Sequence, residues 1–310
     1  MQPTATRENL RTLNKKRREY TVDRVAFLGF SYTLVAIVAV FCLVPFLLVV
    51  SASFTDEQAL IRYGHSVWPS IFSLESYRLS LANPPAILRA YRNTIFVTVA
   101  GTFLGVFINA MTGYVLTRKD FPWRNKFSYF FFFTTLFSGG LVPFYIMVAN
   151  TLGWKNSFLA LIIPGIVSVW NMLLVKGYMS SIPFEITESA KMDGAGDFRI
   201  FLQFIMPLAK PVLATISLFT AIGLWNDWFN TMLFITNERM FTLQFFLHRL
   251  INSVRVIRAI MDEAGVDIPT LPVQSMQMAL TVIVTGPIML FYPFIQKYFM
   301  QGLTVGSVKG

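Results

Sequence analysis

The sequence predicts an all-α integral membrane protein with six transmembrane helices. Of its 310 residues, 55% are hydrophobic and only 14% are charged, whereas about 25% of the residues of an ordinary soluble domain are charged. A soluble globule of this size could not bury so much apolar surface in one core. The apolar stretches are also continuous, without the polar alternation of a transmembrane β-barrel.

Six windows that are almost free of charge provide the expected spans. A helix needs about 20 apolar residues to cross the hydrocarbon core of a bilayer. The helices are predicted near residues 26–53, 93–117, 127–150, 157–179, 207–233 and 273–299. Together they form one transmembrane domain over residues 26–299, in which Asp227 is the one acid of the fifth window.

The basic residues orient this domain in the membrane. Seventeen of the 26 Lys and Arg residues fall in the N-terminal tail, in the loops after the second and fourth helices, and near the C-terminus. The positive-inside rule then places both termini in the cytoplasm. We expect cytoplasmic tails at 1–25 and 300–310, and no nucleic-acid partner for the basic N-terminal tail.

Two long segments are expected on the external side. Residues 54–92 contain the turn signal Trp68-Pro69. Residues 238–272 carry apolar residues near helical spacing, from Phe241 to Ile251, with arginines among them. This pattern predicts a short amphipathic helix, which either lies on lipid or forms a docking surface for an external partner.

The cytoplasmic loop at 181–207 has the features of a short helix followed by a turn. Pro183 suits the first turn of a helix, and Glu185 and Glu188 are favoured near its positive N-terminus. A helix with small residues on its face suits insertion into a groove of another protein. The residues expected on one face are Ile186, Ser189 and Ala190.

The end of this loop contains a second helix signal. Gly194 and Gly196 are expected to end the first helix, and Asp197 to cap the next one, which runs toward Pro207. The order Glu188-Ser189-Ala190, Gly194, Ile205-Met206-Pro207 resembles the EAA loop of importer permeases of the ATP-binding cassette (ABC) class. Ser189 stands where alanine is usual, and both side chains are small.

The resemblance implies a role for this loop. In that family it is the coupling helix that docks into the cytoplasmic ATPase subunit. The implied coupling residues are Glu185, Glu188, Ser189, Ala190, Asp193, Gly194, Ala195 and Pro207.

The resemblance extends over nearly all of the chain after Asn93. Residues 137–145, 224–229 and 292–310 look like the LplC-type branch of sugar permeases, which is related to the MalG group. It implies the type I ABC importer permease fold in a bacterial plasma membrane. It also implies that the substrate is an oligosaccharide or a polysaccharide fragment, for example one derived from alginate or pectin.

The partners follow from the same resemblance. They would be a second homologous permease, two ATPase subunits, and a solute-binding protein that docks on residues 54–92 and 238–272. The sequence contains no phosphate-binding loop of the Gly-x-x-x-x-Gly-Lys-Ser/Thr type. We therefore expect no enzymatic activity and no cofactor on this chain, with ATP and Mg²⁺ bound by the partner ATPase.

Polar residues in the membrane windows are candidates for the substrate path. A charge inside a span is costly and usually faces a cavity or a partner. Aromatic faces could stack on sugar rings while Asn and Asp bind hydroxyl groups, or the tryptophans could form an interfacial belt. Asn171, like Asn109, could instead bridge helices. The path candidates are Trp225, Asn226, Asp227, Trp228, Asn230 and Asn171.

Two other classes of membrane protein compete with this interpretation. An ion-coupled carrier or channel would usually place several ionisable groups within the membrane, where this chain has Asp227. A membrane enzyme would need a nucleophile, paired acids or a metal cluster. One cysteine, Cys42, and two histidines cannot form a multi-cysteine or histidine-rich metal site.

Overall fold

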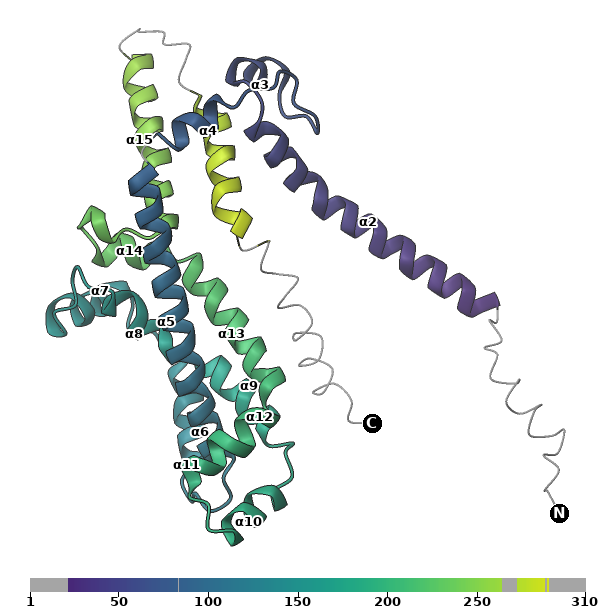
Figure 1. Cartoon of the computed structure of the whole chain (residues 1–310), viewed down its shortest axis with the longest axis vertical. Helices are drawn as coiled ribbons and strands as arrows, with labels where there is room; N and C mark the ends of the chain where they lie inside the picture. Colours follow the sequence, from purple (N-terminus) through teal and green to yellow (C-terminus); the bar gives the residue numbers. More distant parts are fainter. Residues whose placement is uncertain (1–21, 83, 264–271, 288, 290–310) are drawn as a thin grey trace.

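The computed structural model describes residues 22–82, 84–263, 272–287 and 289. Figure 1 shows an elongated body of helices, from which the first long helix, α2 (Val22–Ser53), projects away. The described residues contain no strand, and one isolated β-bridge joins Thr55 to Phe72. The all-α class predicted from composition is confirmed.

The long helix α5 (Pro84–Thr117) forms the centre of the body. It packs against α8 (Leu159–Ile166), α9 (Val169–Met179) and α13 (Lys210–Trp225). Small residues let membrane helices approach closely. At Gly113 an added Cβ would lie only 2.8 Å from Cγ1 of Val175 on α9.

Asn109 ties α5 to the break between α8 and α9. Its side-chain amide donates to the carbonyl oxygens of Gly105 (2.6 Å) and Ile166 (2.7 Å), and its Oδ1 accepts from the Ser168 backbone N–H (3.1 Å). The carbonyl of Ile166 and the N–H of Ser168 fall where the helical ladder is interrupted. Asn109 therefore satisfies backbone groups that the bilayer could not, and its predicted bridging role is confirmed.

Three predicted spans are broken helices in the structure. The third consists of α6 (Arg124–Thr134), α7 (Leu141–Tyr145) and a π-helical turn at Ile146–Thr151, separated by a loop that ends at Gly140 with φ 85°. The fourth bends by 43° between α8 and α9. The fifth is divided between α13 and α14 (Phe229–Phe234).

The described residues therefore contain fewer uninterrupted spans than the charge-free windows suggest. By length and composition, α2 and α5 can each cross a membrane, and the count rises to four if each of two bent helix pairs is one span. A helix over 273–287 begins the predicted sixth span. The remainder of that span beyond 289, the C-terminal tail at 300–310 and residues 1–21 of the N-terminal tail lie outside the described residues.

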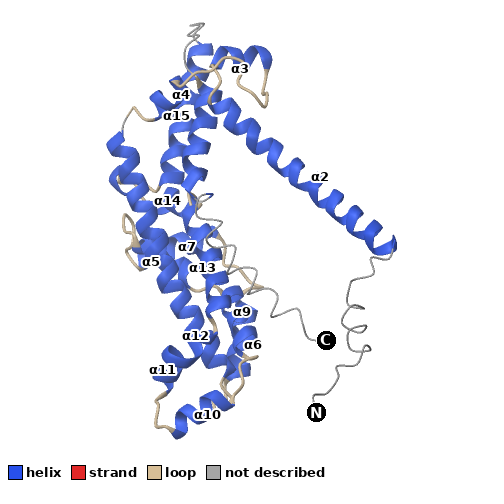
Figure 2. Ribbon diagram, turned by 45° about the vertical axis from the view of Figure 1, so that its right-hand side comes forward, coloured by secondary structure: helices blue, strands red, loops and turns tan. Residues whose placement is uncertain are grey.

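One end of the molecule carries α3 (Glu57–Tyr63), α4 (Glu75–Ser80) and the predicted amphipathic helix, α15 (Leu243–Glu263). We call it the α3 end; Figure 2 shows it opposite the loop that carries α10 (Glu185–Met192). The carboxylate of Glu57 accepts hydrogen bonds from the backbone N–H groups of Gln274 (2.9 Å) and Ser275 (2.8 Å). A buried carboxylate thus joins α3 to the start of the 273–287 helix.

The apolar side chains in the first part of α15 are covered by protein. Leu243 and Leu247 pack with Ala90 of α5 and with Met276 and Leu280 of the 273–287 helix. Farther along the helix, Val256, Ile257 and Ile260 are exposed. The helix follows a 3₁₀ turn at Glu238–Met240, so the described part of the predicted external segment, 238–263, is largely helical.

Candidate functional site

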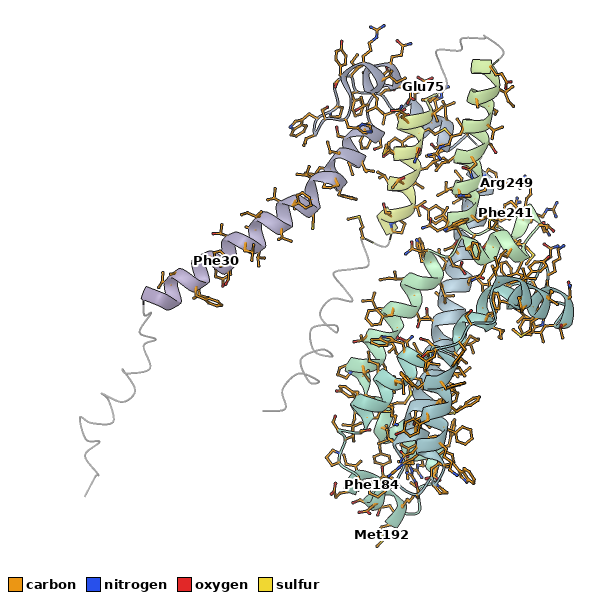
Figure 3. The ribbon with its side chains drawn as sticks, turned by 180° about the vertical axis from the view of Figure 1, so that it is seen from behind. Phe30, Glu75, Phe184, Met192, Phe241 and Arg249 are labelled. Atoms are coloured by element: carbon orange, nitrogen blue, oxygen red, sulfur yellow. The ribbon has the colours of Figure 1, made fainter. Side chains whose placement is uncertain are left out.

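Helix α10 lies at the tip of the molecule, opposite the α3 end. Figure 3 shows Met192 at this extremity and Phe184 just above it, with Glu75 at the far end. Met192 is 88% exposed, and Glu185, Glu188 and Ser189 are also exposed. A helix that presents acidic, small and apolar side chains beyond the body of the protein has the form of a docking element.

The opposite face of α10 is anchored in the core. Thr187 and Ala190 are buried, and Ala190 belongs to a cluster that includes Val175 of α9, Ile200, and Val212 of α13. Ala195 packs against the same cluster. The buried face of α10 therefore belongs to the same close-packed cluster as residues of α9 and α13, and close-packed interiors deform little.

A glycine turn follows α10. Gly194 has φ 77°, a conformation that other residues adopt at a cost. Asp193 precedes it and Pro207 lies in α12 (Met206–Leu208), after α11 (Asp197–Ile200) and a π-helical turn at Phe201–Ile205. The segment Asp197–Leu208 meets α13 at 85°, so it lies across the end of the body.

The predicted cap at Asp197 is wrong, because Gly196 takes the cap position and provides no side chain. Asp197 instead belongs to an ion-pair cluster around Arg118, which directly follows α5. Arg118 donates from Nη2 to Asp197 Oδ1 (2.9 Å) and from Nε to Asp120 Oδ1 (2.9 Å). Its Nη1 donates to the Tyr114 hydroxyl (2.9 Å), and Lys191 Nζ of α10 donates to Asp120 Oδ2 (2.7 Å). We call Tyr114, Arg118, Asp120, Lys191 and Asp197 the Arg118 cluster.

Electrostatics favour the charged form of the cluster. The side chain of Arg118 is 6% exposed, so its charge is held away from water and needs its acidic partners. Hydrogen bonds from Arg118, and then from Lys191, hold the pKa of Asp120 well below its usual value of 3.8. The same hydrogen bond to Asp120 raises the pKa of Lys191. Asp120 and Lys191 therefore keep their charges at neutral pH, and the ion pairs of the cluster fasten α10 and α11 to the end of α5.

A cavity of about 680 Å³ lies between the α8–α9 pair and the α13–α14 pair. Three predicted path residues line it: Asn171, Asp227 and Asn230. Asp227 accepts from the Asn230 side-chain amide (2.7 Å), and the Asn171 amide donates to the Thr220 hydroxyl (3.2 Å). Asn171 thus bridges α9 and α13 as well as facing the cavity.

The other three path candidates do not line this cavity. Trp225 is 9% exposed and packs with Leu243 and Leu247 on the α15 side. Asn226 accepts a hydrogen bond from Gln244 (3.0 Å), and Trp228 stacks on His248 at 4.5 Å between ring centroids. Consecutive residues project in different directions around the break between α13 and α14, which divides the Trp225–Asn230 run between two surfaces.

Two features of the site have no signal in the local sequence pattern. The partners Arg118 and Asp197 are 79 residues apart, and no periodicity links them. Trp170, which is 71% exposed and lines the cavity beside Asn171, falls within an apolar window and looks like an ordinary span residue. The position of Arg118 at a helix end, close to Asp120, is the one local indication of an ionic site.

Comparisons with known proteins agree with this arrangement. Residues 101–305 match the family described as "Binding-protein-dependent transport system inner membrane component". The permease protein YtcP of a Bacillus subtilis polygalacturonan/rhamnogalacturonan transport system is 35% identical over 279 residues, which cover 90% of this chain and 96% of YtcP. Protein LplC of Bacillus subtilis is 34% identical over 296 residues, which cover 96% of this chain and 97% of LplC.

A solved structure has the same fold. It is a chain of a bacterial ABC transporter involved in the import of the acidic polysaccharide alginate, and it superposes with a TM-score of 0.78 at 28% identity. The match covers 90% of this chain and 99% of that one. The chain therefore belongs to the family of binding-protein-dependent transport system inner membrane components, the permease subunits of ABC importers.

Proposed function

We propose that the chain is one of two permease subunits of a bacterial importer that passes an oligosaccharide or polysaccharide fragment across the plasma membrane. Permease subunits are not enzymes, and ATP is used by a partner ATPase. One observation carries the proposal: α10 is exposed on one face, while Ala190 on its other face belongs to one buried cluster with residues of α9 and α13, helices that also line the cavity. A displacement of α10 by an ATPase would therefore reach the walls of the cavity.

The exposed residues of α10 and the turn after it form the coupling surface. Glu185, Glu188 and Ser189 face outward, where an ATPase groove can receive them. On the opposite side, Ala190 and Ala195 pack in the buried cluster of the body. Asp193 and Gly194 form the turn that reverses the chain, and Pro207 lies where the segment meets the body.

Asn171, Asp227 and Asn230 form the substrate path together with Trp170. Aromatic rings offer an apolar face to sugar rings, while amides and carboxylates bind hydroxyl groups. The names of two relatives refer to polygalacturonan and alginate, which directs the proposal to fragments of acidic polysaccharides. The described lining contains Asp227 but no Lys or Arg. This chain would therefore bind sugar hydroxyls, and the second permease would supply cations for the uronate groups.

The second permease is needed to cover surfaces that this chain leaves open. The membrane-spanning window of α2 has none of its residues buried, and Figure 1 shows this helix apart from the body. The cavity between the α8–α9 pair and the α13–α14 pair is also partly open to the outside. We place two ATPase subunits at the α10 end, both termini in the cytoplasm, and the solute-binding protein at the α3 end, on residues 54–92 and 238–272.

Site-directed cross-linking tests this proposal. The exposed Cys42 is first replaced by serine, so that one cysteine can be introduced at a time. In native vesicles, Ser189→Cys on α10 should cross-link to an ATPase subunit. Ser70→Cys, exposed at the α3 end, is the matched control and should not. If Ser189→Cys captures no ATPase while the complex remains assembled, the proposed coupling role is wrong.

A further inference from the structure

A second cavity, of about 300 Å³, lies near the α10 end, between the ends of α5 and α9 and the starts of α6 and α10. Its lining contains four cationic side chains and no Asp or Glu. The cations are Arg118, Lys119, Arg124 and Lys176. A concave site with this charge and without an acid of its own is suited to an anion.

Three of the four cations have no carboxylate partner among the described residues. Only Arg118 forms ion pairs, with Asp120 and Asp197 outside the lining. Arg124 donates to the Arg118 carbonyl oxygen (3.3 Å) and Lys176 to the Ser128 hydroxyl (2.8 Å). An arginine has five N–H donors and a lysine three, so each retains donors for a ligand.

Burial makes the unpaired charges costly. Arg124 and Lys176 are both half-buried, and a partly desolvated cation without a counter-ion is unfavourable. The Nζ of Lys119 lies 5.0 Å from the centre of the Phe184 ring, which places the Lys119 ammonium group beside the start of α10. A bound anion would stabilise all three cations at once.

The residues beside the cavity are of the kind found at the boundary of a bilayer. Helix α6 begins at Arg124, and the aromatic side chains that follow, including Phe130 and Phe133, are exposed as lipid-facing residues are. Trp123 is 53% exposed and carries Lys126 over its ring at 4.3 Å, an arrangement typical of the headgroup level. Basic pockets between membrane helices on the cytoplasmic side bind phospholipid headgroups.

We propose that this cavity binds a phosphate group, held by Lys119, Arg124 and Lys176, and that an anionic phospholipid of the inner leaflet supplies it. Its placement on the inner leaflet rests on the proposed function, which puts α10 in the cytoplasm. The site joins α6 and α9 to the base of α10. A bound lipid would therefore brace the coupling helix against the membrane surface.

Native mass spectrometry of the assembled importer tests the proposal. The delipidated complex is titrated with phosphatidylglycerol, and retained lipid is counted per complex. Removing both charges with Arg124→Gln and Lys176→Gln should weaken retention about 30-fold, since each cation near an anionic headgroup contributes about 1 kcal/mol. Arg199→Gln, at an exposed arginine of α11 outside the lining, should retain the lipid, as should the charge-conserving Lys176→Arg.

Three other results of these titrations would contradict the proposal. Displacement of phosphatidylglycerol by equimolar inorganic phosphate would identify the free anion as the ligand and overturn the lipid source. Equal retention by the wild type and the double variant would overturn the site. Loss of ATPase subunits from the lipid-free double variant would assign the cations to an ATPase carboxylate instead. The same spectra show whether the wild-type complex contains ATPase subunits. A failure of the proposed importer function can therefore be distinguished from a failure of the lipid site.

Discussion

Arg118 connects three parts of the chain that are distant in sequence. It follows the last turn of α5, donates to Asp120 in the next loop, and reaches Asp197 at the start of α11. Lys191 of α10 shares Asp120 with it. Hydrogen bonds between charged groups are short and directional. The residues of the Arg118 cluster therefore set the position of α10 relative to the main helix of the body.

Arg118→Gln should loosen the coupling segment. The substitution removes charge-assisted hydrogen bonds to two aspartates, each worth about 2 kcal/mol when well formed. We expect trypsin to cleave the purified complex faster after Lys191, because local unfolding of α10 would expose this bond more often. Arg199→Gln is the control, since Arg199 is exposed and bonds only to Gln203 among the described residues. Equal cleavage of both variants would show that the cluster does not hold α10.

Acid should release the same cluster. The pKa of Asp120 is lower in the folded protein than its usual 3.8, so ionised Asp120 stabilises the fold above that pH. The stabilisation is lost as pH falls below 3.8 through the depressed value. Asp120→Asn should therefore lower the thermal unfolding midpoint by a constant amount between about pH 5 and pH 7. The difference from the wild type should shrink in stronger acid; a difference that grows there would contradict the assignment.

The residues of the proposed coupling surface stand out in the local sequence, but the Arg118 cluster does not. The residues Glu188, Gly194 and Pro207 lie within one loop, so their spacing is visible in the sequence. Arg118 and Asp197 come together only because α5 and the α10–α11 segment meet in the folded chain. Local sequence can also mislead. The position of Trp225 in a polar run predicts a cavity residue, whereas its side chain is buried against α15.

At the scale of the element, the close contact between α5 and α9 is a sensitive point. A Cβ at Gly113 would lie 2.8 Å from Val175 Cγ1 and 3.1 Å from the Met172 carbonyl oxygen. Gly113→Ala should destabilise the protein by about 1–3 kcal/mol, because the backbone carbonyl cannot move aside easily. Thermal unfolding measures this effect.

Gly177 on α9 provides the matched control. An added Cβ there meets nothing within 4 Å, so Gly177→Ala should be neutral or stabilise the helix by up to about 1 kcal/mol. Equal unfolding midpoints for Gly113→Ala and Gly177→Ala would mean that α5 and α9 are less closely packed than described.

Trp170 tests the cavity as a substrate path. Trp170→Ala should raise the KM of saccharide transport about fivefold, because an aromatic contact is worth about 0.5–1.5 kcal/mol. Assembly should not change, since the side chain is largely exposed. Trp228→Phe, which keeps a ring on His248 outside the cavity, should leave KM unchanged. The opposite pattern would assign the path to the α15 side.

Charge-free windows predict where helices lie but not where they break. The predicted spans near 26–53 and 93–117 correspond to the unbroken helices α2 and α5. The window at 127–150 is equally apolar, yet its helices are separated around Gly140. Glycine and proline are tolerated within membrane helices as well as at breaks, because neighbouring side chains satisfy the freed backbone groups. Asn109 does this at Ile166, on another helix.

At the scale of the whole molecule, α5 connects the two ends to which we assign the docking of the partners. Its 34 residues extend about 50 Å at 1.5 Å per residue, from the α3 end to Arg118. The cavity lies between helices that pack on the same element. In the proposed function, this central helix carries a movement of α10 to the cavity, as population shift between two states of a transporter requires.

The most direct test of the coupling role of α10 is the ATPase activity of the reconstituted importer with Glu188→Lys. The charge reversal lies on the exposed face of α10, so the permease should still assemble. We predict that ATP hydrolysis stimulated by the loaded solute-binding protein, together with uptake, falls at least about tenfold, the factor for a loss of 1.4 kcal/mol. Lys126→Gln, on α6, should retain both activities. Unchanged stimulation and uptake in Glu188→Lys would contradict the account.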